Sequence, residues 1–329
     1  MSEASSPTVG ELNELAVLAR IFPRLPEADA AIVGPGDDAA VLAAPDARYV
    51  VTTDMMVHGP DFRLAWSTPF ELGWKAAATN LSDVAAMGAV PTAIVVALAV
   101  PPALSVVVVE GFADGLRAAC AALAPGCGVV GGDLSASDTL TIAVTAFGDL
   151  QGRPPVLRSG ARVGDLVAIA GELGLAAEGL GLLFREGVDD DGRPDAGLAD
   201  ELRMRHPAAM RAQLAPYPPI AAGPVAAIAG ATAMLDVSDG LSLDAARIAR
   251  SSGVGIDFHV AALGDDPERA LGGGEDHGLL ATFPAGGEVP APFRIIGRVT
   301  DAAGIVSVDG TPHAAVGWDP YSGWDGAAG

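Results

Sequence analysis

Acidic residues recur at the ends of predicted strands and in glycine turns, with few basic residues beside them. They are Asp37 and Asp38 in GPGDD, Asp54 in VTTD, Asp133 in GGD, and Asp236 and Asp239 in DVSDG. Each acid alone is typical of an ordinary turn or helix cap. Brought together, they would repel one another unless cations lay between them. Hard oxygen ligands suit Mg²⁺ shared with substrate phosphates, so the pattern predicts a magnesium site.

Hydroxyl and glycine residues beside these acids extend the same chemistry. Thr52 and Thr53 stand in VTTD and Ser238 in DVSDG, where they can supply neutral oxygen ligands or phosphate donors. The glycines of GPGDD would let the backbone approach a phosphate closely. Asp38 would then meet that phosphate through Mg²⁺, whereas Asp37 fits either a second ligand or a turn residue.

Two further charged residues fit a phosphate site. Asp83 lies among apolar neighbours in NLSDVAAMG, inside a predicted helix, where a carboxylate needs a partner. Arg158, in LRSGARVGD, is the best candidate for direct phosphate contact because its guanidinium can bind two oxygens at once. The alternative for Arg158 is a surface arginine in a linker.

Several common mechanisms lack their residues in this chain. The only lysine, Lys75, stands in GWKAAA, so there is neither a Walker A loop nor the residue set of a protein kinase. Its position inside a predicted helix also argues against a Schiff base. A dinucleotide fingerprint fails because two acids would face the pyrophosphate. The histidines are interpreted as surface or packing residues: His58, His206, His259, His277 and His313.

Bulk composition excludes other classes. A net charge of −22 argues against a nucleic-acid binder and an anionic membrane surface. The uncharged segment 84–109 is long enough to span a bilayer, but Gly88, Pro91 and the Pro101-Pro102 pair interrupt it, so we expect no membrane helix. The spacing of the two cysteines indicates reduced thiols, and the N-terminus lacks a basic signal region. These features predict a cytoplasmic enzyme.

The elements that must position the acids alternate between strands and helices. In the first half, strands are predicted at 47–54, 92–100, 128–133 and 139–150, with helices at 69–87 and 105–123. The helix at 69–87 opens with Thr68-Pro69-Phe70-Glu71, a capping box with proline at the first helical position.

A second unit begins with the Gly-, Pro- and Arg-rich segment 151–165. It contains buried strands at 165–171 and 233–239, and helices at 172–184, 207–214 and 240–253. We therefore predict a mixed α/β chain with one domain at 1–150 and another at 151–329.

Seven motifs together resemble the thiamine-monophosphate kinases, which belong to the aminoimidazole-ribonucleotide-synthetase-like ATP enzymes. In order they are GPGDDAAVL, VTTDMMV, NLSDVAAMGA, GGDLS, RSGARVGD, LDVSDGL and GGGEDHGLL. The resemblance covers about residues 10–325 and implies a two-domain PurM-like architecture. It also implies a homodimer whose N-terminal domains pair their sheets, and ATP-dependent phosphorylation of thiamine monophosphate to thiamine diphosphate.

The same resemblance assigns roles to individual positions. The metal ligands it implies are Asp38, Thr52, Thr53, Asp54, Asp83, Asp133, Asp236 and Asp239, all serving Mg²⁺. The ATP contacts are Gly132, Arg158 and Ser238. The contacts on the thiamine side are Asp61, Glu275 and Trp324.

Two residues depart from the family pattern near the expected thiamine pocket. Asp61 stands where relatives typically have histidine, and His58, three residues earlier, is either a substitute or without a role there. His277 takes the place of a tyrosine. The alternatives to a thiamine-monophosphate kinase are a related enzyme with another acceptor and a non-catalytic ATP-binding regulator. Under the first hypothesis the nucleophile is a phosphate oxygen, largely ionised at pH 7 because its second pKa is about 6, so no strong general base is required.

Overall fold

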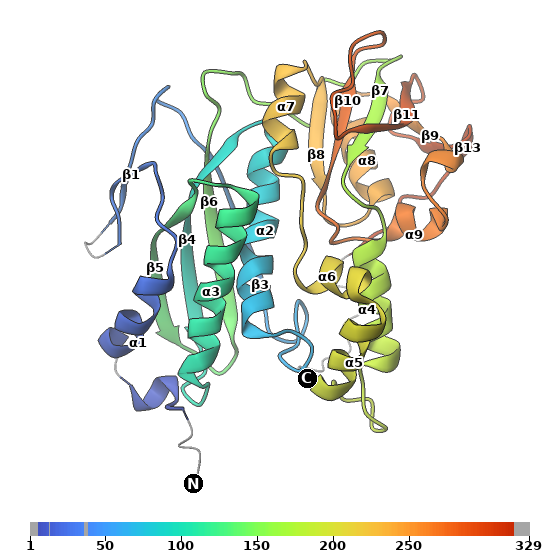
Figure 1. Cartoon of the computed structure of the whole chain (residues 1–329). Helices are drawn as coiled ribbons and strands as arrows, with labels where there is room; N and C mark the ends of the chain where they lie inside the picture. The colour runs from blue at the N-terminus through green and yellow to red at the C-terminus, as the bar shows by residue number, and fades with distance from the viewer. Residues whose placement is uncertain (1–5, 13, 36–38, 319–329) are drawn as a thin grey trace.

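The N-terminal half is built around a four-stranded sheet with the strand order β3-β6-β4-β5. The computed structural model describes residues 6–12, 14–35 and 39–318 (Figure 1). The strands are β3 (Val50–Val57), β4 (Val90–Val100), β5 (Gly128–Ala136) and β6 (Thr141–Asp149). β4 and β5 are parallel, and the other neighbours are antiparallel.

Two long helices cover one face of this sheet, α2 (Pro69–Ala86) and α3 (Val106–Leu123). The predicted capping box is confirmed, because Thr68 accepts from the Glu71 amide and the Glu71 carboxylate accepts from the Thr68 amide. The helices touch at glycines: a Cβ on Gly73 would lie 1.9 Å from the Phe112 carbonyl oxygen. Only glycine permits this approach.

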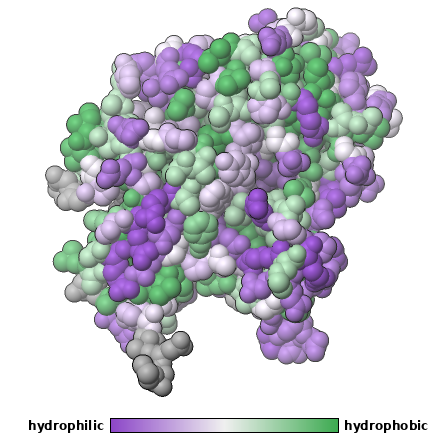
Figure 2. All heavy atoms as spheres, viewed as in Figure 1, coloured by the Kyte–Doolittle hydropathy of each residue, from purple (hydrophilic) through white to green (hydrophobic). Residues whose placement is uncertain are grey.

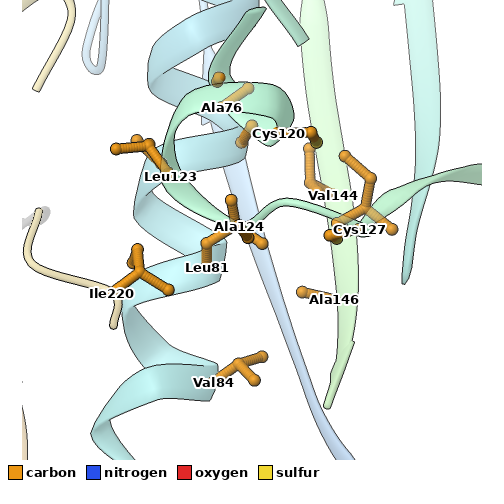
Figure 3. Packing of buried hydrophobic residues seen from close by; sticks show 14 of the residues in the cluster. Ala76, Leu81, Val84, Cys120, Leu123, Ala124, Cys127, Val144, Ala146 and Ile220 are labelled. Atoms are coloured by element: carbon orange, nitrogen blue, oxygen red, sulfur yellow. The ribbon is translucent and has the colours of Figure 1, made fainter. Parts of the chain in front are cut away.

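The core between sheet and helices is made of small and branched side chains. Figure 3 shows Ala76, Leu81 and Val84 of α2 packed toward Val144 and Ala146 of β6. Cys120 and Cys127 are buried in the same cluster as free thiols, as predicted.

The C-terminal half holds a seven-stranded sheet with the order β13-β12-β9-β11-β7-β10-β8. Its strands are β7 (Leu166–Ala170), β8 (Ala233–Val237), β9 (Gly255–Phe258), β10 (Gly278–Phe283), β11 (Arg294–Thr300), β12 (Val306–Val308) and β13 (Thr311–Pro312). Its helices are α4 (Leu175–Glu186), α5 (Ala196–Arg205), α6 (Pro207–Leu214), α7 (Ala222–Ile228), α8 (Leu241–Ser252) and α9 (Pro267–Gly272), with a 3₁₀ turn η3 (Val260–Ala262). The predicted mixed α/β class is confirmed.

Shorter elements precede the first sheet. They are the 3₁₀ turns η1 (Val9–Glu11) and η2 (Phe22–Arg24), the helix α1 (Glu14–Ile21), and the small antiparallel pair β1 (Ala31–Val33) and β2 (Val41–Leu42). The β1–β2 pair lies at the outer edge of the N-terminal half (Figure 1).

The two halves pack directly against each other. α2 lies between them and contacts β8, β10, α6 and α7 of the second half (Figure 1). The largest core cluster includes Leu81 and Val84 from the first half together with Ala168 and Phe283 from the second. The predicted division after residue 150 falls in the connection from β6 to β7 and stays a prediction.

The uncharged segment at 84–109 is divided among the end of α2, the strand β4, a turn and the start of α3. Within the described residues, no helix combines the length and the apolar character needed to cross a membrane. On the face drawn in Figure 2, hydrophilic residues gather over two lower lobes, with a hollow between the lobes.

Candidate functional site

A cluster of carboxylates forms where α2 meets β3 and β8. Thr52 on β3 donates from its hydroxyl to the Asp83 carboxylate on α2 over 2.8 Å. Burial, followed by the negative charges of Asp236 and Asp54, raises the pKa of Asp83 to about 7. Asp83 thus has the hydroxyl partner that its apolar surroundings require.

Asp236, in the buried strand β8, completes this cluster. Its Oδ2 accepts from the Ser82 hydroxyl over 3.2 Å and lies 3.2 Å from Nδ1 of His277. Burial opposes ionisation of Asp236, but the hydrogen bond and charge of His277 outweigh it and lower the Asp236 pKa. The same contact raises the pKa of His277 against the effect of its own burial. His277 is therefore buried, in agreement with one of the two roles expected from the sequence, surface or packing, and it is also an ion partner of Asp236.

Asp54 on β3 belongs to the same electrostatic cluster. Partial burial and then the charge of Asp236 raise the Asp54 pKa. The backbone amide of Asp54 donates to the Asn80 side chain of α2 over 3.2 Å, which ties this strand to the helix. Residues from both halves of the chain thus build up negative charge at one junction.

The donor chemistry of this junction fits Mg²⁺. Asp54, Asp83 and Asp236 offer hard oxygen atoms, and burial followed by the charges of neighbouring carboxylates raises the pKa values of the first two. Within 6–12, 14–35 and 39–318, no group of three or more acidic, histidine or cysteine side chains is arranged to hold a metal ion on its own. Substrate phosphates and water would have to complete the coordination, which is the usual situation for Mg²⁺.

Asp133 lies away from this cluster. It pairs in register with Ala97, which pairs with Ala143, which in turn pairs with Met55. Side chains of paired residues share a face, so Asp133 lies on the face of Met55, which is 62% exposed. Successive residues alternate, so Asp54 faces the opposite side. Asp133 is therefore three strands from Asp54 and on the other face, and one chain does not unite them.

Two other predicted residues lie near Asp133: Thr53 shares the outer face with it, and Gly132 precedes it on β5. The Thr53 hydroxyl accepts from Thr145 on β6 over 3.1 Å, so it too points away from Asp83. Gly132 adjoins Asp133 on β5, and a Cβ there would lie 2.0 Å from the Val96 carbonyl oxygen. This strand contact gives Gly132 a packing reason to be glycine.

The DVSDG segment leads from β8 into α8. Asp239 forms an ion pair with Arg247 of α8 at 2.5 Å, so a metal ion at Asp239 would compete with a guanidinium. Arg247 also pairs with Asp244, whose pKa burial raises to about 6. Ser238 accepts a backbone hydrogen bond from Glu275 over 2.7 Å through its carbonyl, which joins this turn to the GGGED segment.

Arg158 is exposed in the connection before β7, and its carbonyl accepts from the Ser252 hydroxyl over 3.1 Å. Asp276 has a structural role, since its carboxylate accepts from the amides of Gly174 and Ala176 at the start of α4. Asp37, Asp38 and Trp324 lie outside the described residues. Their predicted roles stay predictions.

A cavity of about 400 Å³ is lined by residues of both halves of the chain. Glu275 in its wall acts electrostatically on His277 of the carboxylate cluster. Apolar side chains form much of its wall: Phe62, Trp66, Leu180, Leu183, Phe184, Leu214 and Trp318. Asp61, Arg63, Lys75 and Glu275 add two negative and two positive charges. A pocket of this composition suits an organic ring that carries charged groups.

Lys75 and its partners form the polar floor of this cavity. Its ammonium donates to the Glu275 carboxylate over 2.8 Å and to the Gln213 carbonyl over 3.1 Å. The Gln213 amide donates to the same Glu275 oxygen over 2.6 Å. Burial opposes ionisation of Glu275, but the charge of Lys75 outweighs it and lowers the Glu275 pKa.

Sequence reasoning excluded Lys75 from Schiff-base chemistry and gave it no other role. A signal was present, because a lone lysine beside Ala76, Ala77 and Ala78 stands in a stretch of helix that is otherwise apolar. A buried lysine needs an acid. The identity of that acid, 200 positions away, could not be found from spacing.

The chain is similar in sequence to known proteins. Residues 36–150 match the family model of the AIR synthase related protein, N-terminal domain. The chain is 42% identical to the thiamine-monophosphate kinase of Mycobacterium tuberculosis, covering 97% of this chain and 93% of the relative. It is 40% identical to that of Corynebacterium glutamicum, covering 96% of this chain and 95% of the relative.

Solved structures are similar to this chain over most of its length. AaThiL complexed with AMPPCP and TMP superposes with a TM-score of 0.71 at 32% identity, covering 96% of this chain and 99% of that one. The thiamine-monophosphate kinase of Stenotrophomonas maltophilia gives a TM-score of 0.76 at 34% identity, covering 92% of this chain and 98% of that one. The hydrogenase maturation protein HypE of E. coli, at 16% identity and a TM-score of 0.67, shares the fold. This chain belongs to the thiamine-monophosphate kinase family.

Proposed function

We propose that this chain transfers the γ-phosphoryl group of ATP to thiamine monophosphate and forms thiamine diphosphate. The observation that carries the proposal is the similarity over 96% of the chain to AaThiL complexed with AMPPCP, an ATP analogue, and TMP. The carboxylate cluster and the adjoining cavity supply a place for phosphates and a place for an organic ring. A cytoplasmic location is part of the proposal, supported by the two free thiols.

The attacking group in this reaction is a phosphate oxygen of the acceptor. Because the second pKa of a phosphate monoester is about 6, this oxygen is already ionised at pH 7 and needs no strong base. The remaining barrier is the approach of two anions, which positioning and charge neutralisation lower. Asp54, Asp83 and Asp236 would hold Mg²⁺, which supplies that neutralisation when bound.

The chain's own contacts keep these ligands in place. Ser82 and His277 both contact Oδ2 of Asp236, and Thr52 donates to the Asp83 carboxylate. Residues that hydrogen-bond to metal ligands in this way orient those ligands. Removing such a residue typically lowers metal affinity about 10- to 100-fold. The unusual His277 therefore serves the phosphate site through Asp236.

We further propose a homodimer that pairs the outer faces of the two four-stranded sheets. Val51 and Met55, two large apolar side chains on either side of Thr53, are 60% and 62% exposed on this face, and exposed apolar residues on one sheet face favour a contact with another protein surface. Thr53 and Asp133 lie on the same face. A second copy packed there would bring its own Asp133 to the outer face of β3, beside Thr53, which precedes Asp54 in the chain.

An ADP-release assay tests the proposed reaction. The full chain is incubated with Mg-ATP, with and without thiamine monophosphate, and thiamine diphosphate is quantified. We expect ADP release that depends on thiamine monophosphate and equals the thiamine diphosphate formed. Thermal stabilisation by ATP without ADP release would indicate a non-catalytic regulator, and turnover with a different acceptor would indicate another activity.

A further inference from the structure

The four charged side chains of the cavity are not equivalent. Lys75 and Glu275 neutralise each other across 2.8 Å, and Gln213 reinforces that pair. The guanidinium of Arg63 is 4.7 Å from the Trp66 ring centroid and 4.9 Å from that of Phe184, so it is held in the aromatic wall. Stacking of this kind stabilises a buried guanidinium.

Asp61 has a different environment. Its Oδ2 accepts from the backbone amide of Val57 over 2.7 Å, which fixes the loop that follows β3. Among the residues that the structure describes, no ion pair engages the Asp61 carboxylate at up to 4.0 Å. Within that part of the chain, the negative charge of Asp61 therefore faces the cavity without a cation of its own.

The surroundings of Asp61 add to this negative charge. Its pKa is raised by burial and then by the charge of Glu275, while Lys75 acts in the opposite sense. Two carboxylates thus share one lysine at this end of the cavity. A cation that enters there would lower the electrostatic energy of both acids.

We propose that Asp61 makes this cavity selective for a ring that carries a positive charge. The inference rests on the proposed function, because the thiazolium ring of thiamine monophosphate is such a cation. The apolar wall accepts the rings, and Asp61 balances the quaternary nitrogen. A neutral ring of the same shape would fill the cavity but leave Asp61 unbalanced.

The test compares two ligands of the same shape. One is thiamine monophosphate, and the other is its neutral isostere, in which carbon replaces the quaternary ring nitrogen. Affinities for the full chain are measured by titration calorimetry at pH 8, in Asp61→Asn and in the unchanged protein. The amide introduced by Asp61→Asn keeps an oxygen that can accept from Val57, so the loop is preserved. The exposed Asp301→Asn, in the turn between β11 and β12, is a matched control for net charge.

We expect Asp61→Asn to weaken thiamine monophosphate binding about tenfold, which corresponds to about 1.4 kcal/mol, and to change binding of the neutral isostere less than about twofold. In the unchanged protein, added salt should reduce the ratio of the affinity for thiamine monophosphate to the affinity for the neutral isostere. Asp301→Asn should leave the ratio of affinities unchanged.

Two results would overturn the inference alone. Equal weakening of both ligands would show that Asp61 only supports the loop, and no weakening of either would show that it does not face the ligand. Both leave the proposed function intact if the unchanged protein still forms thiamine diphosphate. Failure of the unchanged protein to bind or phosphorylate thiamine monophosphate would instead overturn the proposed function, and the inference with it.

Discussion

At the scale of single residues, burial and neighbouring negative charges raise the pKa values of two acids at the junction, Asp83 and Asp54. Asp83 shows this most clearly, with a pKa raised to about 7. A carboxylate whose folded pKa exceeds its unfolded value favours folding at low pH, and this advantage is lost as the pH rises through the folded pKa. For Asp83 the window extends from about pH 4 to about pH 7.

Metal-free protein should therefore become less stable as the pH rises across this window. In EDTA, we expect the Tm to be several degrees lower at pH 8 than at pH 5, and Asp83→Asn to reduce that difference. Each unit of pKa shift corresponds to about 1.4 kcal/mol. Differential scanning calorimetry checks the prediction. Mg²⁺ with an ATP analogue should raise the Tm at pH 8 in the unchanged protein, and an identical pH dependence in Asp83→Asn would contradict it.

Asp54 provides a direct test of the phosphate site. Asp54→Asn keeps the size of the side chain but removes its charge, so we expect kcat to fall about 100-fold or more, the scale of losing one transition-state contact. The Mg²⁺ concentration needed for half-maximal rate should rise. Asp190→Asn, in the exposed α4–α5 loop, is the control. Normal turnover of Asp54→Asn would remove Asp54 from the site.

The sequence was sufficient to single out some of the acids that the structure brings together, but not their partners. Asp54 lies within β3, which continues past the predicted strand end, Asp236 lies within β8, and Asp83 lies in an apolar stretch of α2; such local apolar surroundings are evident from composition. The pairing of Asp236 with His277, and of Asp239 with Arg247, depends on how strands and helices approach in space. No spacing rule predicts that approach.

At the scale of elements, α2 determines the geometry of both sites. It carries Lys75 toward the cavity and Ser82 and Asp83 toward the carboxylates. Its beginning was predictable because the capping box is a local signal. Its close contact with α3 was not, since the glycines that permit it lie about 40 positions apart.

The contact between α2 and α3 should not tolerate a side chain at position 73. Gly73→Ala places a Cβ against the Phe112 carbonyl, so we expect the helices to separate and the free energy of unfolding to fall by about 1–3 kcal/mol or more. Chemical denaturation measures the change. Gly131→Ala is the matched control, because a Cβ at Gly131 meets nothing within 4 Å. Equal stability of the two variants would show that α2 and α3 adjust without cost.

At the scale of the whole molecule, the outer face of the four-stranded sheet is where a second chain would contribute to the active site. Asp133 lies there, three strands from Asp54. If a second copy supplies Asp133, two inactive variants should complement each other. Mixed dimers of Asp54→Ala and Asp133→Ala hold one site with both changes and one with neither.

We therefore expect a refolded equimolar mixture of these variants to recover about a quarter of the original activity, because half of the dimers are mixed and each has one intact site. A mixture of Asp54→Ala and Asp83→Ala should recover none, since both residues belong to the same chain's cluster. Activity is measured by ADP release, and dimerisation by sedimentation. Absence of recovery in the first mixture, with dimers present, would show that each chain builds its site alone.

The solitary lysine has a practical consequence for chemical biology. Apart from the amino terminus, Lys75 is the only primary amine in the chain, and Glu275 and the cavity wall shield it. General amine-reactive reagents will leave the folded protein nearly unlabelled. A ring-shaped ligand that bears an amine-selective electrophile would find a single amine at the cavity floor, which reacts in its deprotonated form. Such a probe would attach at one position, and mass spectrometry would count occupied cavities directly.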